Sequence, residues 1–207
     1  MRERTHRLEK FDQFLTEKAE GKVNRICRGA ARVFSIKGFC DTTLADVSRA
    51  AGVSKGGIYH YFATKEELLF TILNRHMDKV LGGLKEKLKD ITVPQEKIRF
   101  FIERHIELYC NNVHESRLIL HETNTLPPKR WKVVREKTKE YTAILRDMIE
   151  DFLERENGIS EKVKVYAYSL LGMCNWIYWW YDPKGPVKPE ELAEEIYTIF
   201  VGNLKAK

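Results

Sequence analysis

The sequence of 207 residues predicts an all-α protein, and three observations support this fold class. Apolar residues recur every three or four positions through most of the chain, which is the spacing that buries one face of a helix. The six prolines separate long periodic segments and do not interrupt them. No segment shows the alternation of apolar and polar residues that a half-buried strand requires.

The chain begins with a polar, charged segment over residues 1–20, which is either a helical extension or a frayed arm. The first firm helix is expected over residues 21–37, because its apolar positions follow the 3.6-residue period. Gly38 ends this helix, since glycine readily adopts the left-handed conformation found at helix C-termini.

Two short helices joined by a tight turn are predicted next. Thr43 followed by Asp46 resembles a capping box, which opens a helix that ends at residue 51. Gly52 makes the turn, and a serine caps the second helix, over residues 55–61. Longer helices follow, of which the first opens with a full capping box and the last with a first-turn proline. Their expected ranges are 65–88, 94–111, 114–123, 129–156, 159–180 and 189–204.

Basic residues are concentrated in the first third of the chain. Residues 1–62 contain 12 Lys and Arg against 7 Asp and Glu, whereas the remaining residues contain 24 against 23. Such a distribution is typical of a phosphate-binding unit joined to a nearly neutral partner. No stretch approaches the ~18 apolar residues of a membrane span. The charged start lacks the apolar segment of a signal peptide, so we expect a cytoplasmic protein.

The two short helices have the spacing of a helix-turn-helix, with apolar side chains able to pack between them. Such a motif places its second helix in the major groove of DNA. Gly56 and Gly57 lie in this helix although each costs about 1 kcal/mol relative to alanine, which indicates a close approach of the backbone to DNA. A packed helical hairpin with no DNA role is the alternative. Helix starts favour anions, and the polar residues at these starts are Thr43, Ser54 and Lys65.

Residues 42–65 resemble the N-terminal signature of the TetR family of transcriptional regulators. Ser48 departs from the family pattern, which has alanine there, and residues 30–39 are similar to the family's first helix. The chain is therefore identified as a member of this family on the matching residues Thr43, Val47, Ala51, Gly52, Val53, Ser54, Gly56, Tyr59, Tyr61, Phe62, Lys65 and Leu68.

The resemblance implies a DNA-binding protein with three parts: an extension over 1–20, a three-helix unit with the helix-turn-helix over 21–67, and a helical bundle over 68–207 that binds a ligand and dimerises. Bases of double-stranded operator DNA would meet Lys55 and Gly56, with Gly57 beside them. Phe62 would pack in the small core. The residues expected to touch phosphates are Thr43, Tyr59, His60, Tyr61 and Lys65.

The resemblance also implies a homodimer formed by the last two helices, with contacts from Trp180, Ile196, Tyr197 and Phe200. The aromatic segment 172–193 is similar to TetR regulators of fatty-acid or steroid breakdown that respond to acyl-CoA thioesters. This similarity implies an acyl-CoA effector, and the expected ligand-binding residues are Phe101, His105, Tyr109, Leu145, Asn175, Trp176 and Trp179. Basic residues that could meet the phosphates of such a ligand are Arg117, Lys129, Arg130 and Arg146.

Three alternatives remain at this point. An efflux regulator for drug-like cations would need buried carboxylates, for which Glu103, Glu107 and Glu122 are available. A helical enzyme could use His105, Glu107 or His121, although nothing convergent supports catalysis. A DNA-binding protein without a ligand is the third.

No cofactor is expected, and His105, His114 and His121 lack the spacing of a metal site. The four cysteines are spaced too widely for a C-x-x-C pair and are expected to be reduced. The basic residues of the extension suggest an arm that adds non-specific DNA affinity, and these are Arg2, Arg4, Arg7 and Lys10.

Overall fold

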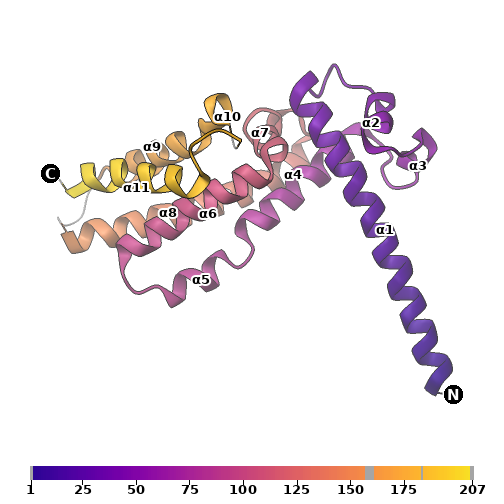
Figure 1. The fold of residues 1–207 in the computed structure, drawn as a ribbon, viewed down its shortest axis with the longest axis horizontal. Helices are drawn as coiled ribbons and strands as arrows, with labels where there is room; N and C mark the ends of the chain where they lie inside the picture. Colours follow the sequence, from indigo (N-terminus) through magenta and orange to yellow (C-terminus); the bar gives the residue numbers. More distant parts are fainter. Residues whose placement is uncertain (1, 157–160, 183, 206–207) are drawn as a thin grey trace.

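The fold was obtained as a computed structural model, which describes residues 2–156, 161–182 and 184–205. Within these ranges all regular elements are helices, as the sequence predicts (Figure 1). A small unit of α1, α2 and α3 lies at one end of a longer helical bundle (Figure 1). The elements are α1 Arg2–Lys37, α2 Leu44–Ala51, α3 Lys55–Tyr59, α4 Lys65–Leu81, α5 Leu84–Asp90, α6 Pro94–Asn111, α7 Val113–His121, the 3₁₀ turn η1 Thr123–Thr125, α8 Pro128–Glu156, α9 Val163–Asn175, α10 Ile177–Trp180 and α11 Pro189–Lys205.

The N-terminal extension is part of α1. This helix has 36 residues, which corresponds to about 54 Å at 1.5 Å per residue. Its first half projects away from the rest of the molecule (Figure 1). The helix therefore continues through residue 20, where a boundary was expected. The alternative of a frayed arm is wrong for the described residues.

The second half of α1 packs against α2 in the small unit. Ile26, Ala30, Val47 and Ile58 are fully buried between the three helices. Gly29 lets α1 approach α2 closely, because a Cβ atom there would lie 2.8 Å from the Ala51 Cα atom. The apolar periodicity of residues 21–37 and the short helix spacing thus predicted the right core.

The helix expected over 65–88 is in fact two helices. It ends at Leu81, and Gly83 has a φ of 68° that breaks the helical path before α5 begins. Arg104 stabilises the break, since its guanidinium donates to the carbonyl oxygens of Lys79 at 2.9 Å and Gly82 at 2.6 Å. The helix expected over 159–180 also divides, because α9 ends at Asn175 and the short α10 follows. Residues 159 and 160 lie outside the described residues.

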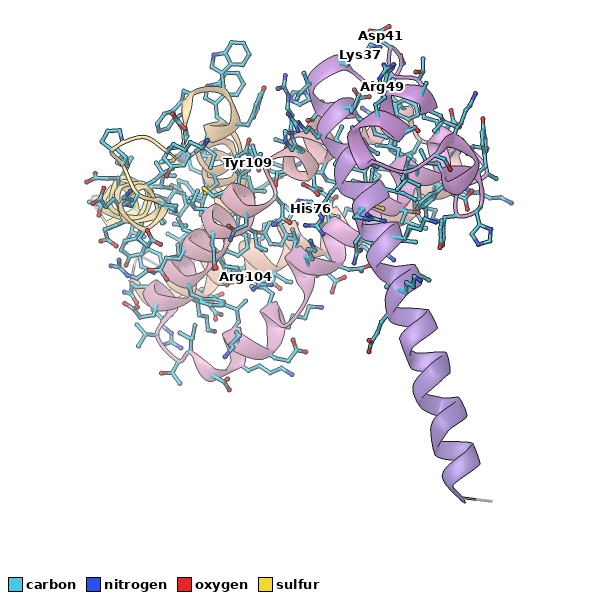
Figure 2. The ribbon with its side chains drawn as sticks, turned by 45° about the vertical axis from the view of Figure 1, so that its right-hand side comes forward. Lys37, Asp41, Arg49, His76, Arg104 and Tyr109 are labelled. Carbon is cyan, nitrogen blue, oxygen red and sulfur yellow. The ribbon has the colours of Figure 1, made fainter. Side chains whose placement is uncertain are left out.

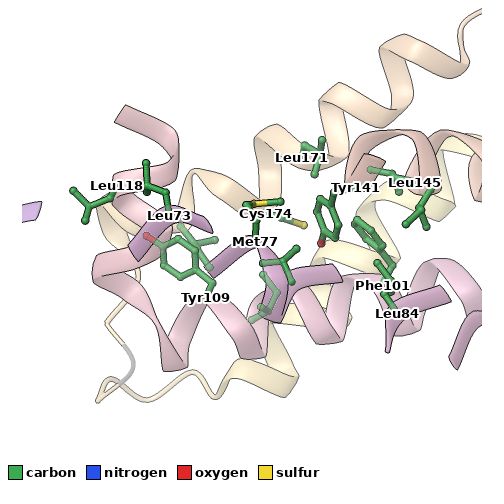
Figure 3. Close-up of a cluster of buried hydrophobic side chains, with 14 of the residues drawn as sticks. Leu73, Met77, Leu84, Phe101, Tyr109, Leu118, Tyr141, Leu145, Leu171 and Cys174 are labelled. Atoms are coloured by element: carbon green, nitrogen blue, oxygen red, sulfur yellow. The ribbon is translucent and has the colours of Figure 1, made fainter. Parts of the chain in front are cut away.

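The bundle has one continuous core. α11 lies along α6, and α4 and α6 both pack on α8. Figure 3 shows a section of this core, in which Phe101 and Leu145 lie near Leu84 while Tyr109 lies further along α6. α1 contacts α4 and α7, so the small unit and the bundle are joined by side-chain packing as well as by the chain. None of the described helices is long and apolar enough to cross a membrane.

Candidate DNA-binding surface and effector cavity

The start of α2 is fixed by a capping box, as its sequence predicts. The Thr43 backbone N–H donates to the Asp46 carboxylate at 2.9 Å, and the Asp46 N–H donates back to the Thr43 hydroxyl at 3.2 Å. Lys37 pairs with the same carboxylate at 2.9 Å. The Thr43 backbone bond, followed by the Lys37 side chain, holds the pKa of Asp46 below its usual range. The Thr43 hydroxyl also donates to this carboxylate at 2.8 Å, so the start of α2 already holds an anion and a phosphate contact of Thr43 stays a prediction.

The turn between α2 and α3 depends on Gly52 and on Ser48. Gly52 has a φ of 60°, which glycine adopts without strain. The Ser48 hydroxyl donates to the Val53 carbonyl oxygen at 2.6 Å. The alanine of the family pattern could not make this bond. Ser48 therefore adds a hydrogen bond that stabilises the turn.

The two glycines of α3 have different surroundings. Ser54 caps the helix by accepting the Gly57 N–H at 3.1 Å. A Cβ atom at Gly57 would lie 2.9 Å from the Val53 Cγ1 atom, whereas one at Gly56 would meet nothing within 4 Å. Packing inside the motif therefore explains Gly57, contrary to the expectation that both glycines are there for DNA. Gly56 has no such internal reason and faces outward.

Three of the predicted DNA-binding side chains are exposed on or next to α3. Lys55, Tyr59 and His60 are exposed, with Tyr59 half accessible. Tyr61 is partly buried, and the Lys22 ammonium lies 5.8 Å from its ring centre. Phe62 is buried in the small core, as expected. The exposed groups on and next to α3 are the Lys55 ammonium, the Tyr59 hydroxyl, the His60 imidazole and the backbone at Gly56. Each of them can bind a phosphate or a base edge.

Lys65 has a different environment. Its ammonium donates to the carbonyl oxygens of Phe39 at 2.7 Å, Cys40 at 3.2 Å and Thr42 at 3.0 Å, and it lies 4.3 Å from the Phe39 ring centre. An ammonium has three N–H donors, so the loop between α1 and α2 takes all of them. A phosphate contact of Lys65 would have to replace one of these bonds, and it stays a prediction.

A partly open cavity of about 110 Å³ lies between α4, α6, α7, α8 and α9. Apolar side chains form much of its wall, including Met77, Leu108 and Leu171. Its polar wall contains His105, Tyr109 and Asn175, which the sequence analysis named, and also His76 and Ser116, which it missed. His76 and Ser116 gave no sequence signal, because only the packing of α4 on α7 brings them together.

The polar groups of the cavity are neutral near pH 7. Burial lowers the pKa of His76 to about 4, and it has the same effect on His105, to about 4. Burial also raises the pKa of Tyr109 above its usual range. His105 Nδ1 lies 2.9 Å from the Tyr141 hydroxyl, which fixes this pair. The cavity therefore presents hydrogen-bonding groups without a net charge.

Two buried polar atoms at this cavity lack a partner among the described residues: His76 Nδ1 and the Tyr109 hydroxyl. Figure 2 shows both residues in the middle of the molecule, His76 toward α1 and Tyr109 on α6. A buried polar atom without a partner costs about 1–3 kcal/mol. A ligand with a neutral polar group, such as a thioester carbonyl, can supply the missing bonds.

The remaining predicted ligand residues lie elsewhere. Phe101 and Leu145 are fully buried in the core beside the cavity, where Phe101 stacks on Tyr141 at 4.8 Å between ring centres. Trp176 and Trp179 do not line the cavity; they lie on the outer surface, 57% and 70% exposed. The sequence showed an aromatic cluster, but these rings lie on the outer surface at and beyond the end of α9.

The carboxylates required by a cationic effector are also absent from this cavity. Glu103 and Glu107 are exposed, and Glu122 accepts the Phe39 backbone N–H at 3.4 Å outside it. The basic candidates Arg117, Lys129, Arg130 and Arg146 do not line it either.

The predicted dimer contacts require a correction. Ile196 and Phe200 are buried within the protomer, where α11 packs along α6. Tyr197 is covered by the Arg99 guanidinium, 3.9 Å from its ring centre. Trp180 alone of the four is largely exposed. The exposed apolar residues of α9 and α11 are Val165, Tyr168 and Ile199, and these residues with the exposed Trp176 and Trp180 are called here the α9–α11 face.

Together these features define a class. A helix-turn-helix with an outward-facing second helix, joined to a helical bundle with a cavity, is the architecture of a DNA-binding transcriptional regulator. The chain belongs to the TetR family: residues 26–72 match the bacterial regulatory proteins of the tetR family, and residues 92–204 match the tetracyclin repressor-like C-terminal domain.

Individual relatives are distant but span most of the chain. The transcriptional activator FasR of Mycolicibacterium smegmatis is 23% identical over 84% of this chain and 79% of its own length. The transcriptional repressor KstR2 of the same species is 23% identical over 84% of this chain and 86% of its own. The structure of AibR in complex with isovaleryl coenzyme A and operator DNA has a TM-score of 0.75, with 29% identity over 86% of this chain and 97% of that one.

Proposed function

We propose that the protein is a repressor that binds a palindromic operator as a dimer and leaves it when an acyl-CoA binds in the bundle. The observation that carries this proposal is the uncharged cavity, with its apolar wall and two unpartnered polar atoms. A thioester has the matching chemistry, since it combines an apolar chain with a carbonyl oxygen. The structural relative AibR was solved with isovaleryl coenzyme A and operator DNA, which supports an acyl-CoA as the class of effector.

Operator binding is assigned to the outer surface of α3. Lys55 is the exposed cation at the start of this helix, and Gly56 leaves its backbone bare. Tyr59 and His60 are exposed beside them and can contact phosphates. One such motif reads only a few base pairs, so two copies about 34 Å apart on a palindrome are needed.

The dimer is assigned to the α9–α11 face. A monomeric soluble protein rarely exposes a row of large apolar residues, and Val165, Tyr168 and Trp176 have the helical spacing of such a row. Apposition of this face with its copy would bury the row. The buried residues Ile196 and Phe200 would then support the interface from behind.

The cavity favours a short acyl chain. Pockets for drug-sized ligands measure roughly 300–1,000 Å³, and this cavity measures about 110 Å³. A branched or straight chain of a few carbons is the part of a thioester that fits without repacking the core.

The test measures DNA release by fluorescence anisotropy. An operator is first selected from random-sequence DNA by the wild-type protein, and acyl-CoAs from isovaleryl-CoA to palmitoyl-CoA are then titrated into the complex. We expect release at the lowest concentration with the short chains and no release with cationic dyes. Tighter DNA binding with acyl-CoA would make the protein an effector-dependent activator or corepressor-type regulator, and no response to any acyl-CoA would refute the proposed effector class.

A further inference from the structure

A second hollow lies between the small unit and the bundle. It is a cleft of about 770 Å³, bordered on one side by α1 and on the other by α4, the end of α6 and the start of α7. It is therefore several times larger than the effector cavity. In Figure 2 its position is marked by His76, which lies on the side of the bundle that faces α1.

The cleft is basic. Arg28 and Arg32 of α1 lie one turn apart on its wall, and Arg75 and Lys79 of α4 lie opposite. The acidic residues on its wall are Asp78, which is paired with Lys137, and Glu115. Arg75 is paired with Glu20 and Asp78 with Lys137, so three cations without a carboxylate partner face one carboxylate, Glu115.

Two of these four cations have partners in the described part of the chain, and the other two, Arg28 and Arg32, have none. Arg75 binds Asn24 at 2.8 Å and Glu20 at 3.3 Å, and Lys79 binds Asn112 at 3.2 Å. No hydrogen bond or ion pair to the guanidinium groups of Arg28 and Arg32 is present among these residues. Both side chains are exposed to the cleft, where they can bind a phosphate in the bidentate manner that arginine favours.

The cleft and the effector cavity share one lining residue. His76 is only 5% exposed and lines both spaces. Its Nε2 atom lies 3.4 Å from the Ser116 hydroxyl, while its Nδ1 atom lacks a partner. A long ligand that passes the His76 side chain would have one end in the apolar space and the other end among arginines.

We propose that the cleft binds the phosphate groups of a nucleotide thioester, with Arg28 and Arg32 as the phosphate ligands on α1, while the acyl end lies in the cavity. The inference rests on the proposed function and adds the site of the nucleotide. A 770 Å³ cleft has room for a nucleotide, which the 110 Å³ cavity does not.

In this placement the ligand also contacts the DNA-binding unit directly. α1 belongs to the small unit, whereas α4, α6 and α7 form the wall of the bundle. Phosphates that bind both walls stabilise the relative position of the two units in which both walls contact them. A ligand can shift an equilibrium only through such a difference in affinity between states.

The experiment compares two ligands by calorimetry. Isovaleryl-CoA carries the phosphates, and the isovaleryl thioester of N-acetylcysteamine lacks them. The double variant Arg28→Gln/Arg32→Gln should bind isovaleryl-CoA at least about tenfold more weakly than wild type, since charge-assisted hydrogen bonds are lost. Its affinity for the short thioester should equal that of wild type, and its isovaleryl-CoA affinity should depend less on salt.

The matched control is Arg146→Gln/Arg155→Gln, which removes two exposed arginines from α8, outside both spaces. It should bind both ligands as wild type does. Equal isovaleryl-CoA affinity and salt dependence of Arg28→Gln/Arg32→Gln and wild type would overturn the phosphate site and leave the proposed function intact. Loss of affinity for both ligands alike, or weaker operator binding without any effector, would also overturn it. If wild type binds neither thioester, the proposed function fails and this inference fails with it.

Discussion

Lys55 and Lys65 show how two lysines ten residues apart in one motif can have separate tasks. Lys55 is exposed on the outer surface of α3, whereas the Lys65 ammonium is bound by three carbonyl oxygens of the loop before α2. The resemblance to a family signature assigned DNA contacts to both. The surroundings differ, because the Lys65 ammonium has three backbone partners in the loop before α2, and a DNA contact of either lysine stays a prediction.

We therefore expect Lys65→Met to lower the free energy of unfolding by about 1.5–3 kcal/mol, the value of a charged hydrogen-bonded group. Lys55→Met is the matched control and should leave unfolding unchanged while weakening operator binding and reducing the salt slope by about 0.9. Urea denaturation and fluorescence anisotropy provide the two readouts. A Lys65→Met protein that is as stable as wild type but loses a salt-dependent DNA contact would establish Lys65 as a phosphate ligand.

The paired glycines of α3 allow a second residue-scale test. Gly57→Ala should destabilise the protein by about 1–3 kcal/mol, because its Cβ atom would lie 2.9 Å from Val53 Cγ1 in a packed turn. Gly56→Ala meets no atom within 4 Å, so it should fold as well as wild type or slightly better. Its operator affinity should nevertheless fall, since the methyl group would face DNA. Unchanged DNA binding by Gly56→Ala would remove the reason for a bare backbone there.

The buried histidines predict a pH dependence of stability. The pKa of His76 falls from 6.5 to about 4 on folding, so the unfolded state binds a proton that the folded state does not in that range. Stability is therefore unaffected above about pH 6.5 and decreases as the pH falls toward 4. His76→Asn should lose this part of the slope, at most about 1.4 kcal/mol per pH unit. Parallel stability curves for the variant and wild type between pH 4 and 6.5 would contradict the neutral buried state.

At the scale of elements, the sequence predicted helix ends that depend on neighbouring residues, and it missed helix ends that depend on packing. The capping box at Thr43 and the glycine turn at Gly52 involve residues within a few positions, so the sequence predicted α2 and α3 closely. Gly82 and Gly83 indicated the break after Leu81, but the apolar periodicity of residues 65–88 favoured one continuous helix. The break after α9 follows Gly172 by about one turn, a signal that the apolar run around it outweighed, and the exposed Trp179 and Trp180 lie beyond it.

Which face of a long helix borders a cavity depends on its neighbours. His105, Tyr109 and Asn175 were predicted to bind ligand and do line the cavity, while His76 and Ser116 were missed. Residues with apolar neighbours at helical spacing, such as Phe101 and Leu145, look alike in sequence whether they line a cavity or fill a core.

The α9–α11 face gives a prediction for the element scale. Val165→Glu on α9 should dissociate the dimer, because it would bury charges at the centre of an apolar interface. Val133→Glu, on an exposed position of α8, is the control and should remain dimeric. Light scattering at micromolar concentration measures the state, and operator affinity should fall together with dimerisation. A wild-type monomer, or a dimeric Val165→Glu protein, would place the interface elsewhere.

The whole molecule is two units joined by α4 and by the contacts of α1 with α4 and α7. α4 begins beside the helix-turn-helix at Lys65 and reaches the effector cavity at His76, Met77 and Val80. We propose that a change at the far end of this helix alters the spacing of the two α3 helices in the proposed dimer.

The same coupling must act in both directions. If an acyl-CoA lowers operator affinity by a given factor, the operator must lower acyl-CoA affinity by that factor, which is about 5- to 150-fold for a coupling of 1–3 kcal/mol. Calorimetry of isovaleryl-CoA with and without saturating operator measures it directly, and DNA of unrelated sequence is the control. The expected result is weaker binding in the presence of the operator only. Equal affinities would disprove the coupling even if the ligand binds tightly, because a ligand that does not distinguish two states cannot shift them.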